Sequence, residues 1–221
     1  MRCELPLGNL SLIRRNSLNV IIISVEFLVD GDDFYFIEVN PRVQVEHTVT
    51  EEITGVDIVK SQLLIAQGYG LHEAPLNIPA QDKLLAVGVA IQSRITTEDP
   101  ANNFMPDTGK IDWYRSPGGT GIRLDAGNVY AGATVTPFFD SLLVKVVAHG
   151  TDFTEAVDKM QRALNEFAIR GVKTNIPFLK KVYAHPTFRA ADAPTTFVDK
   201  HPELFESAPD KEPDRKLLRY V

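Results

Sequence analysis

The sequence predicts an α+β protein, and three observations support this fold class. Two β-rich runs flank an Asp-Gly-Asp-Asp turn at residues 30–33, which predicts a hairpin over residues 25–39. Apolar runs at residues 84–95 and 141–148 predict further strands. An apolar stripe with helical spacing over residues 153–167 predicts an amphipathic helix. Hairpin, strands and helix together indicate a mixed fold.

The composition is that of an ordinary globular protein. The chain has 221 residues, of which 44% are hydrophobic and 24% are charged, and its formal net charge is −6. This charge gives no reason to expect a nucleic-acid surface. The apolar runs are too short to cross a membrane. A single cysteine, Cys3, excludes an internal disulfide and fits a reducing compartment.

The longest predicted helix, residues 153–167, has a signal at each end. Asp152 and Glu155 form a capping-box pattern at its start. Gly171 is expected to close it, because glycine tolerates the left-handed conformation at a helix end. A shorter helix, opened by Asn175-Ile176-Pro177, is expected to follow and to reach about residue 184.

Two smaller elements are also expected. A helix over residues 58–67 has Asp57 as its N-cap and Gly68 as its stop signal. The β-forming residues 113–115 predict a short strand.

Polar and apolar residues alternate along residues 38–46, Glu-Val-Asn-Pro-Arg-Val-Gln-Val-Glu. In an extended chain the even-numbered residues share one face over roughly 27 Å, since a strand rises about 3.3 Å per residue. Pro41 removes one ladder donor, so we expect the run to lie at a sheet edge or to bend there. The pattern predicts a row of polar side chains: Glu38, Asn40, Arg42, Gln44 and Glu46.

Glu26 is expected to face Glu38 across the hairpin, because both residues are equally far from residue 32. Directly opposed carboxylates repel each other, and a hard divalent cation would reverse that effect. Two carboxylates and the side chain of Asn40, with phosphate completing the shell, are typical Mg²⁺ ligands. The pairing therefore predicts a metal site, and a slip of one residue in register would remove it.

A solvated polar strand face is the alternative interpretation of the same alternation. In that arrangement Arg42 and Glu46 form a surface ion pair that contributes less than about 1 kcal/mol.

Residues 34–51, Phe-Tyr-Phe-Ile-Glu-Val-Asn-Pro-Arg-Val-Gln-Val-Glu-His-Thr-Val-Thr-Glu, closely resemble the signature of biotin-dependent carboxylases, which belong to the ATP-grasp superfamily. Similarity covers residues 25 to about 205 and includes the segments 53–57, 94–100, 116–119, 139–141 and 170–175. The resemblance implies the C-terminal half of an ATP-grasp domain followed by the biotin carboxylase C-terminal domain. Residues 96–104 and 114–125 look like the pyruvate carboxylase branch of the family, from which acetyl-CoA and propionyl-CoA carboxylases usually differ there.

The resemblance implies a ligase reaction in which ATP and bicarbonate form carboxyphosphate, whose CO₂ then carboxylates biotin. Mg²⁺ or Mn²⁺ is the expected metal and ATP is a substrate. By resemblance, Glu26 and Glu38 are the metal ligands through which ATP is bound, and Asn40 adds to that metal site.

The remaining roles concern bicarbonate and biotin. By resemblance, Glu46 is the base that deprotonates bicarbonate, while Arg42, Gln44 and the backbone of Val45 hold that anion. Arg94 resembles the arginine that stabilises the biotin enolate. These residue types suit the chemistry, because arginine presents a planar fork to a planar carbonate and a cation stabilises a developing enolate.

The resemblance also implies a division of the chain. We expect an atypical segment over residues 1–24, arising from a shifted reading frame or a wrong start. The ATP-grasp part is expected at 25–75, the biotin carboxylase C-terminal domain at 76–205 and a linker at 206–221. The sequence contains no Met-Lys-Met biotinyl motif, so biotin is expected on a carrier domain outside this chain. Because the phosphate-binding lysines and lid of the family precede the matching region, we expect the isolated chain to be inactive.

Three functions are compatible with these features. The first is the biotin carboxylase step of a pyruvate carboxylase or of an acyl-CoA carboxylase, in a homo-oligomer with ATP, bicarbonate and the carrier domain as partners. The second is a non-catalytic dimerisation or interaction module. The third is an ATP-grasp ligase outside the biotin group, against which the run Arg42–His47 argues. The expected location is the cytoplasm in bacteria or the mitochondrial matrix in eukaryotes, with neither nucleic acid nor membrane as partner.

Overall fold

The computed structural model describes residues 23–127 and 129–206. These fall into two compact units, divided in sequence between Ala90 and Ile91. This division comes later in the chain than the expected domain boundary after residue 75. Nearly all of the expected atypical segment and of the expected linker lies outside the described residues.

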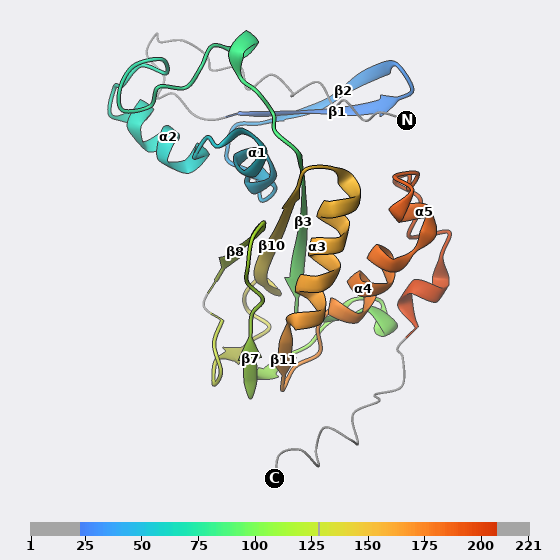
Figure 1. Ribbon diagram of the computed structural model, residues 1–221. Coiled ribbons are helices and arrows are strands. Elements are labelled where there is room, and N and C mark those ends of the chain that lie inside the picture. Colours follow the sequence, from blue (N-terminus) through green and yellow to red (C-terminus); the bar gives the residue numbers. More distant parts are fainter. Residues whose placement is uncertain (1–22, 128, 207–221) are drawn as a thin grey trace. The chain divides into compact units, whose positions relative to one another are not determined.

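The first unit begins with the predicted hairpin (Figure 1). Gly31 takes a φ of 62° in its turn, a positive value that suits the first central residue of a tight hairpin turn. Phe27 makes edge-to-face contacts with Phe34 and Phe36 of the opposite strand, with ring centroids 5.7 and 6.2 Å apart. The elements of this unit are β1 (Ser24–Asp30), β2 (Asp33–Asn40), α1 (His47–Thr54), α2 (Ile58–Ala66) and the 3₁₀ helix η1 (Gln81–Lys83).

Helix α1 was not predicted from the sequence. Five of its eight residues are β-branched, which lowers helix propensity, and its local signal is the C-cap Gly55, which takes a positive φ of 69°. Its tertiary contacts explain its presence. Thr48 and Glu51 are buried, and a Glu51 carboxylate oxygen accepts a 2.7 Å hydrogen bond from the backbone N–H of Ile58. Glu51 thereby joins α1 to the start of α2.

Helix α2 confirms the expected capping. The side chain of Asp57 accepts a 2.8 Å hydrogen bond from the Lys60 N–H. The helix ends at Ala66, immediately before the Gln67–Gly68 turn.

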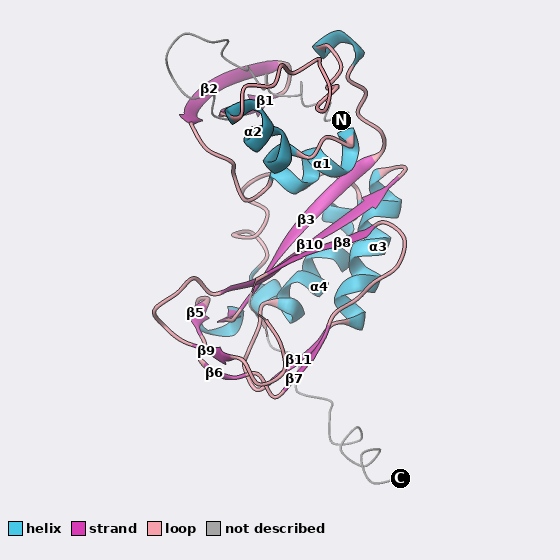
Figure 2. Ribbon diagram, turned by 90° about the vertical axis from the view of Figure 1, so that its left-hand side faces the viewer, coloured by secondary structure: helices cyan, strands magenta, loops and turns pink. Residues whose placement is uncertain are grey.

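The second unit is built on a three-stranded sheet in the order β3-β10-β8 (Figure 2). The strand predicted over residues 84–95 begins only at Val89, because the preceding segment is irregular and Gly88 has a φ of 72°. The strands of this sheet are β3 (Val89–Thr96), β8 (Ile122–Ala126) and β10 (Leu142–Gly150). Paired short strands complete the unit: β4 (Glu98–Asp99) with β5 (Met105–Pro106), β6 (Gly109–Lys110) with β9 (Thr134–Val135), and β7 (Trp113–Arg115) with β11 (Ala168–Arg170).

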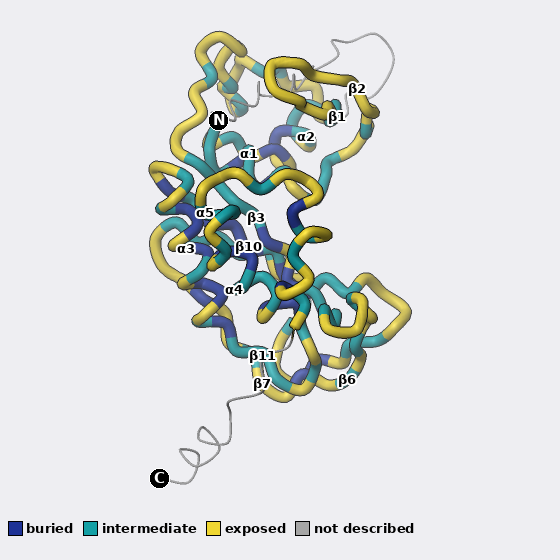
Figure 3. The backbone as a smooth tube through the Cα atoms, turned by 90° about the vertical axis from the view of Figure 1, so that its right-hand side faces the viewer, coloured by how far each residue is buried: buried dark blue, intermediate teal, exposed yellow. Residues whose placement is uncertain are grey.

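Helix α3 (Phe153–Glu166) packs along β10, as Figures 1 and 2 show. Its predicted apolar stripe is confirmed as core, and Met160 and Leu164 are fully buried. Figure 3 shows buried segments, in dark blue, along both of these elements. On β10, side chains of both faces are buried, including Val146 and Val147. The unit's remaining helices are the 3₁₀ helix η2 (Pro100–Asn102), α4 (Ile176–Ala184), α5 (Pro186–Arg189) and the 3₁₀ helix η3 (Pro202–Phe205).

The ends of α3 confirm one expected signal and correct two others. Asp152 caps the helix by accepting a 2.9 Å hydrogen bond from the Glu155 N–H, as predicted. Glu155, however, binds Thr151 rather than the Asp152 N–H, through the Thr151 N–H and hydroxyl, both at 2.6 Å. Gly171 is not the stop signal, because the helix ends at Glu166, Phe167 is its C-cap, and β11 intervenes.

The pH dependence of stability should reveal the Glu155 contacts. Hydrogen bonds from the Thr151 side chain and then from Lys159 lower the Glu155 pKa from 4.5 to about 2. A carboxyl group whose pKa is lower in the folded state stabilises the fold at pH values above its unfolded-state pKa. This stabilisation is lost as pH falls from about 4.5 to about 2. Glu155→Gln should therefore flatten the dependence of the urea midpoint on pH across that window. A slope equal to that of the unsubstituted chain would contradict the assignment.

A smaller apolar cluster anchors the end of the described chain. Val182, Phe197 and Leu204 are buried together, which fixes α4 against the segment that leads to η3. Tyr183 packs on the main core, and its hydroxyl lies 2.7 Å from Ser93 Oγ. Burial raises the pKa of Tyr183 to about 12. Among the described helices, none is both long and apolar enough to span a bilayer.

Candidate functional site

Glu26 and Glu38 are directly opposed across the hairpin, as predicted. The register depends on a β-bulge. Asp30 pairs with Asp33 and Phe27 with Phe36, whereas Glu26 pairs with Glu38, so Ile37 is the extra residue. Without that bulge Glu26 would face Ile37, and the two carboxylates would lie on opposite faces of the hairpin.

Two side-chain amides converge on this carboxylate pair. Asn40 Nδ2 donates to Glu26 Oε1 at 2.7 Å and to Glu38 Oε1 at 2.9 Å. Gln44 Nε2 donates to the same oxygen of Glu26. The amides offset part of the repulsion between the carboxylates, but they bring no positive charge, so the cluster retains a high density of negatively charged oxygen. Such a cluster attracts a hard cation.

The predicted row of polar side chains along residues 38–46 is wrong beyond Asn40. The strand ends there, and the Arg42 N–H bonds the Asn40 carbonyl at 2.8 Å, which turns the chain after Pro41. The bend expected at Pro41 is thus confirmed. Its physical cause is the missing proline N–H, which removes the donor that a continuing ladder would need.

The turn after Pro41 is closed by α1. The Gln44 carbonyl accepts hydrogen bonds from the backbone N–H and from Nδ1 of His47, at 3.3 and 2.7 Å. Glu46 is the exposed N-cap of α1, and its side chain makes no capping hydrogen bond. Arg42 is exposed, and its guanidinium donates to the Val43 carbonyl at 3.4 Å. The loop therefore brings Gln44 back to Glu26 and fixes the backbone of Val45 next to the helix start.

Arg94 belongs to the second unit, where it lies exposed on β3. Asn175 holds this part of the strand: its Nδ2 donates to the Arg94 carbonyl at 2.8 Å, and its Oδ1 accepts from the Thr96 N–H at 3.0 Å. Asn175 is buried at the N-terminus of α4. Its positioning role was not predicted, because a lone asparagine before a helix reads as an ordinary N-cap.

Two family models match the chain in sequence. The biotin carboxylase C-terminal domain matches residues 92–200, and the ATP-binding domain of the carbamoyl-phosphate synthase L chain matches residues 15–74. The first match begins close to the division between the compact units. The second match includes the candidate site residues from Glu26 to Glu46.

Similar proteins are much longer than this chain. It is 57% identical over 198 residues to pyruvate carboxylase of Bacillus subtilis, a match covering 90% of the chain and 17% of that protein. It is 54% identical to pyruvate carboxylase of Staphylococcus aureus, with the same coverage. The chain thus spans about 17% of the length of these relatives.

Solved structures give the same assignment. Pyruvate carboxylase of Rhizobium etli matches with a TM-score of 0.81 and 50% identity, over 86% of this chain and 19% of that one. The biotin carboxylase domain of Hydrogenobacter thermophilus 2-oxoglutarate carboxylase, a dimer in complex with MgADP, ADP and bicarbonate, matches with a TM-score of 0.79 and 40% identity, over 85% of this chain and 40% of that one. The chain therefore belongs to the biotin carboxylase family of ATP-dependent ligases and corresponds to part of the biotin carboxylase region of pyruvate carboxylases.

Proposed function

We propose that this chain supplies the metal- and bicarbonate-binding residues of a biotin carboxylase reaction. In that reaction ATP, bicarbonate and biotin give ADP, phosphate and carboxybiotin, and in a pyruvate carboxylase the carboxyl group then passes to pyruvate to give oxaloacetate. The observation that carries the proposal is the opposition of Glu26 and Glu38, with the amides of Asn40 and Gln44 directed at them.

The carboxylate pair fits a magnesium or manganese ion that binds ATP. Glu26 and Glu38 offer carboxylate oxygens from adjacent strands, and Asn40 would present Oδ1 after its amide rotates by half a turn. The ion neutralises phosphate charge, which is the main electrostatic requirement of phosphoryl transfer. The bound MgADP named for the H. thermophilus relative supports this assignment.

Bicarbonate binding is proposed at the loop that follows β2. Arg42 and Gln44 offer N–H donors, the Val45 backbone is fixed beside them, and the exposed carboxylate of Glu46 would act as the base. Arg94 is proposed to stabilise the enolate of biotin, which a carrier domain delivers. The bicarbonate bound to the same relative supports this part of the proposal.

We also propose an oligomeric state and a cellular location for the whole protein. The biotin carboxylase domain of the H. thermophilus relative is a dimer, which supports a homo-oligomer for the whole protein. The working location would be the bacterial cytoplasm or the mitochondrial matrix.

A chimeric enzyme tests the proposed reaction. Residues 25–205 of this chain would replace the matching segment of B. subtilis pyruvate carboxylase, to which the chain is 57% identical. We expect biotin-dependent ADP release that requires bicarbonate. The purified 221-residue chain, assayed in parallel, should release none. A chimera that folds and assembles like the parent but cleaves no ATP would contradict the proposal.

An association module is the second candidate, and one observation favours it. The hairpin exposes large apolar side chains, each between 40% and 66% accessible: Phe27, Leu28, Val29, Phe34, Tyr35, Phe36, Ile37 and Val39. Exposed apolar side chains in this number are typical of a surface that binds protein. Self-association of the chain through the hairpin would follow from it.

A lysine in the hairpin should weaken such association. Tyr35 is 56% exposed and Tyr130, outside the hairpin, is 55% exposed, so Tyr35→Lys and Tyr130→Lys form a matched pair. We expect Tyr35→Lys to raise the concentration at which the chain associates about tenfold, since a buried aromatic contributes about 1.5–3 kcal/mol. Sedimentation velocity across a concentration series measures this. Equal effects of both substitutions would exclude the hairpin as the interface.

A further inference from the structure

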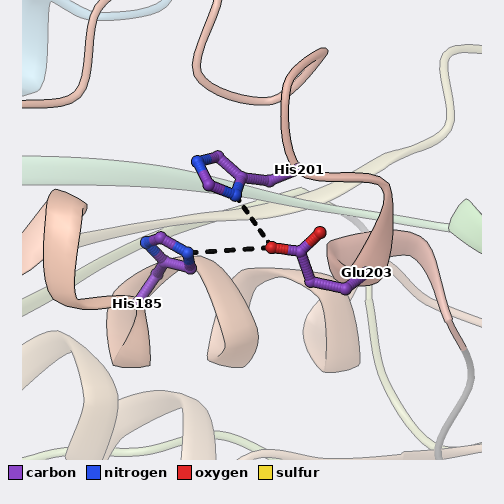
Figure 4. Close-up of side chains that lie close together, drawn as sticks. All are labelled: His185, His201 and Glu203. Atoms are coloured by element: carbon purple, nitrogen blue, oxygen red, sulfur yellow. Dashed lines mark hydrogen bonds and ion pairs between the residues drawn. The ribbon is translucent and has the colours of Figure 1, made fainter.

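Two histidines and a glutamate converge in the second unit, well separated in sequence from the residues assigned above (Figure 4). His201 Nδ1 lies 2.8 Å from Glu203 Oε1, and His185 Nε2 lies 3.8 Å from the same oxygen. One ligand atom from each of the three residues lies within 4.8 Å of the other two. This is the one such group of three or more potential metal ligands within residues 23–127 and 129–206.

The backbone around this cluster is held by buried neighbours. Phe197 and Leu204 are only 4% and 2% exposed, and each is close in sequence to one of the ligands. Lys181, on the last turn of α4, donates to the carbonyls of Glu203 and Glu206 at 2.6 and 2.8 Å. These contacts fix η3 against α4, so the backbone that carries the Glu203 side chain is held in place.

Aromatic packing also restrains both imidazole rings. The Phe197 ring lies 5.0 Å from that of His185 and 4.8 Å from that of His201, and the two imidazoles are 4.3 Å apart. Both histidines are partly buried, while Glu203 remains exposed. An incoming ion can therefore reach the cluster, and the ligands lose little conformational freedom on binding it.

We propose that His185, His201 and Glu203 form a binding site for a divalent transition metal, with zinc the best chemical match. Two imidazole nitrogens and one carboxylate oxygen are a common zinc ligand set that leaves a fourth position for water. Tetrahedral bonds of about 2.0–2.2 Å place ligand atoms about 3.3 Å apart. The observed separations of 2.8 and 3.8 Å lie on either side of this value, so small side-chain movements suffice. Magnesium is a poor match because it prefers oxygen ligands.

Proton positions give the proposal a distinctive consequence. His185 Nδ1 accepts a 3.2 Å hydrogen bond from the Thr187 N–H, which caps α5 and places the ring proton on Nε2, facing Glu203. A metal at Nε2 requires that proton to move to Nδ1. Metal binding must then break the hydrogen bond from Thr187. The cap of α5 and the metal therefore exclude each other, and the Thr187 amide reports on occupancy.

Cobalt(II) is a suitable probe, because its visible absorption reports four-coordinate nitrogen and oxygen ligation. The tag-free 221-residue chain would be titrated with Co²⁺, and Zn²⁺ would then displace it. We expect one four-coordinate ion per chain and a weakening of its binding by at least about tenfold in each of His201→Gln, Glu203→Gln and His185→Asn. Asparagine at position 185 can still cap α5, so loss of binding in that variant reflects loss of the imidazole rather than of the helix.

An exposed histidine elsewhere supplies the control. His72→Gln, in the first unit, should bind Co²⁺ like the unsubstituted chain. In ¹⁵N spectra of the unsubstituted chain, Zn²⁺ should shift the Thr187 amide and move the His185 proton to Nδ1. Unchanged affinity in His201→Gln and Glu203→Gln, or no binding by the folded chain, would overturn the proposal.

Discussion

Replacing Glu46 by glutamine in the chimeric carboxylase is expected to lower kcat for bicarbonate-dependent ATP cleavage by about 10²–10⁴-fold. Glutamine has nearly the same shape as glutamate but cannot accept the bicarbonate proton. KM for ATP should change little, because the substitution removes proton transfer rather than nucleotide binding. The fold should also be retained, since Glu46 is exposed and its side chain does not cap α1.

Glu73→Gln is the matched control for this substitution. Glu73 is an exposed carboxylate of the same unit, and we assign it no role in the reaction. Its replacement should leave kcat unchanged. If Glu46→Gln retained full turnover, or raised KM for ATP at constant kcat, Glu46 would not be the base.

Gly171→Ala is expected to destabilise the second unit by about 2–5 kcal/mol. A Cβ at this position would lie 2.0 Å from the Lys110 carbonyl oxygen and 2.8 Å from the Asp112 backbone nitrogen. The φ of 99° is also unfavourable for any residue with a side chain. Because both clashing atoms belong to backbone, relief requires β11 to move away from the segment between β6 and β7.

Gly118→Ala provides a matched comparison, because a Cβ there meets nothing within 4 Å and its φ is not in the positive range. We expect it to change the free energy of unfolding by less than about 0.5 kcal/mol. Urea unfolding can be followed by the fluorescence of Trp113, the single tryptophan, which pairs with Arg170 across the β7–β11 ladder. Equal midpoints for the two alanine variants would show that the close approach at Gly171 is not required.

The hairpin illustrates how much a local pattern can predict. Asp-Gly in the turn and the β-forming runs beside it were sufficient to predict the hairpin itself. The bulge at Ile37 was not foreseen. The assumed centre at residue 32 gave the right partner only because the structure inserts one extra residue between a two-residue turn and Glu38.

Tertiary contacts decided the features that the sequence did not predict. Alternation at residues 38–46 predicted an extended run, but the strand ends at Asn40, just before Pro41. Helix α1 follows from His47 and forms despite low intrinsic propensity, because Glu51 and Thr48 are buried. Gly171 was read as a helix stop, although its role is to let two backbone segments approach closely. The cluster of His185, His201 and Glu203 also depends on packing, since the segment that follows α5 folds back against α4.

Paramagnetic broadening by Mn²⁺ in ¹⁵N spectra of the chain would show whether Glu26 and Glu38 hold a metal ion, because Mn²⁺ replaces Mg²⁺ at oxygen sites. We expect selective broadening of amides around Glu26, Glu38 and Asn40, lost in Glu26→Gln and Glu38→Gln but retained in Glu73→Gln. Broadening that spares the hairpin, or that persists unchanged in both glutamine variants, would contradict the proposal that this carboxylate pair is the metal site of a biotin carboxylase.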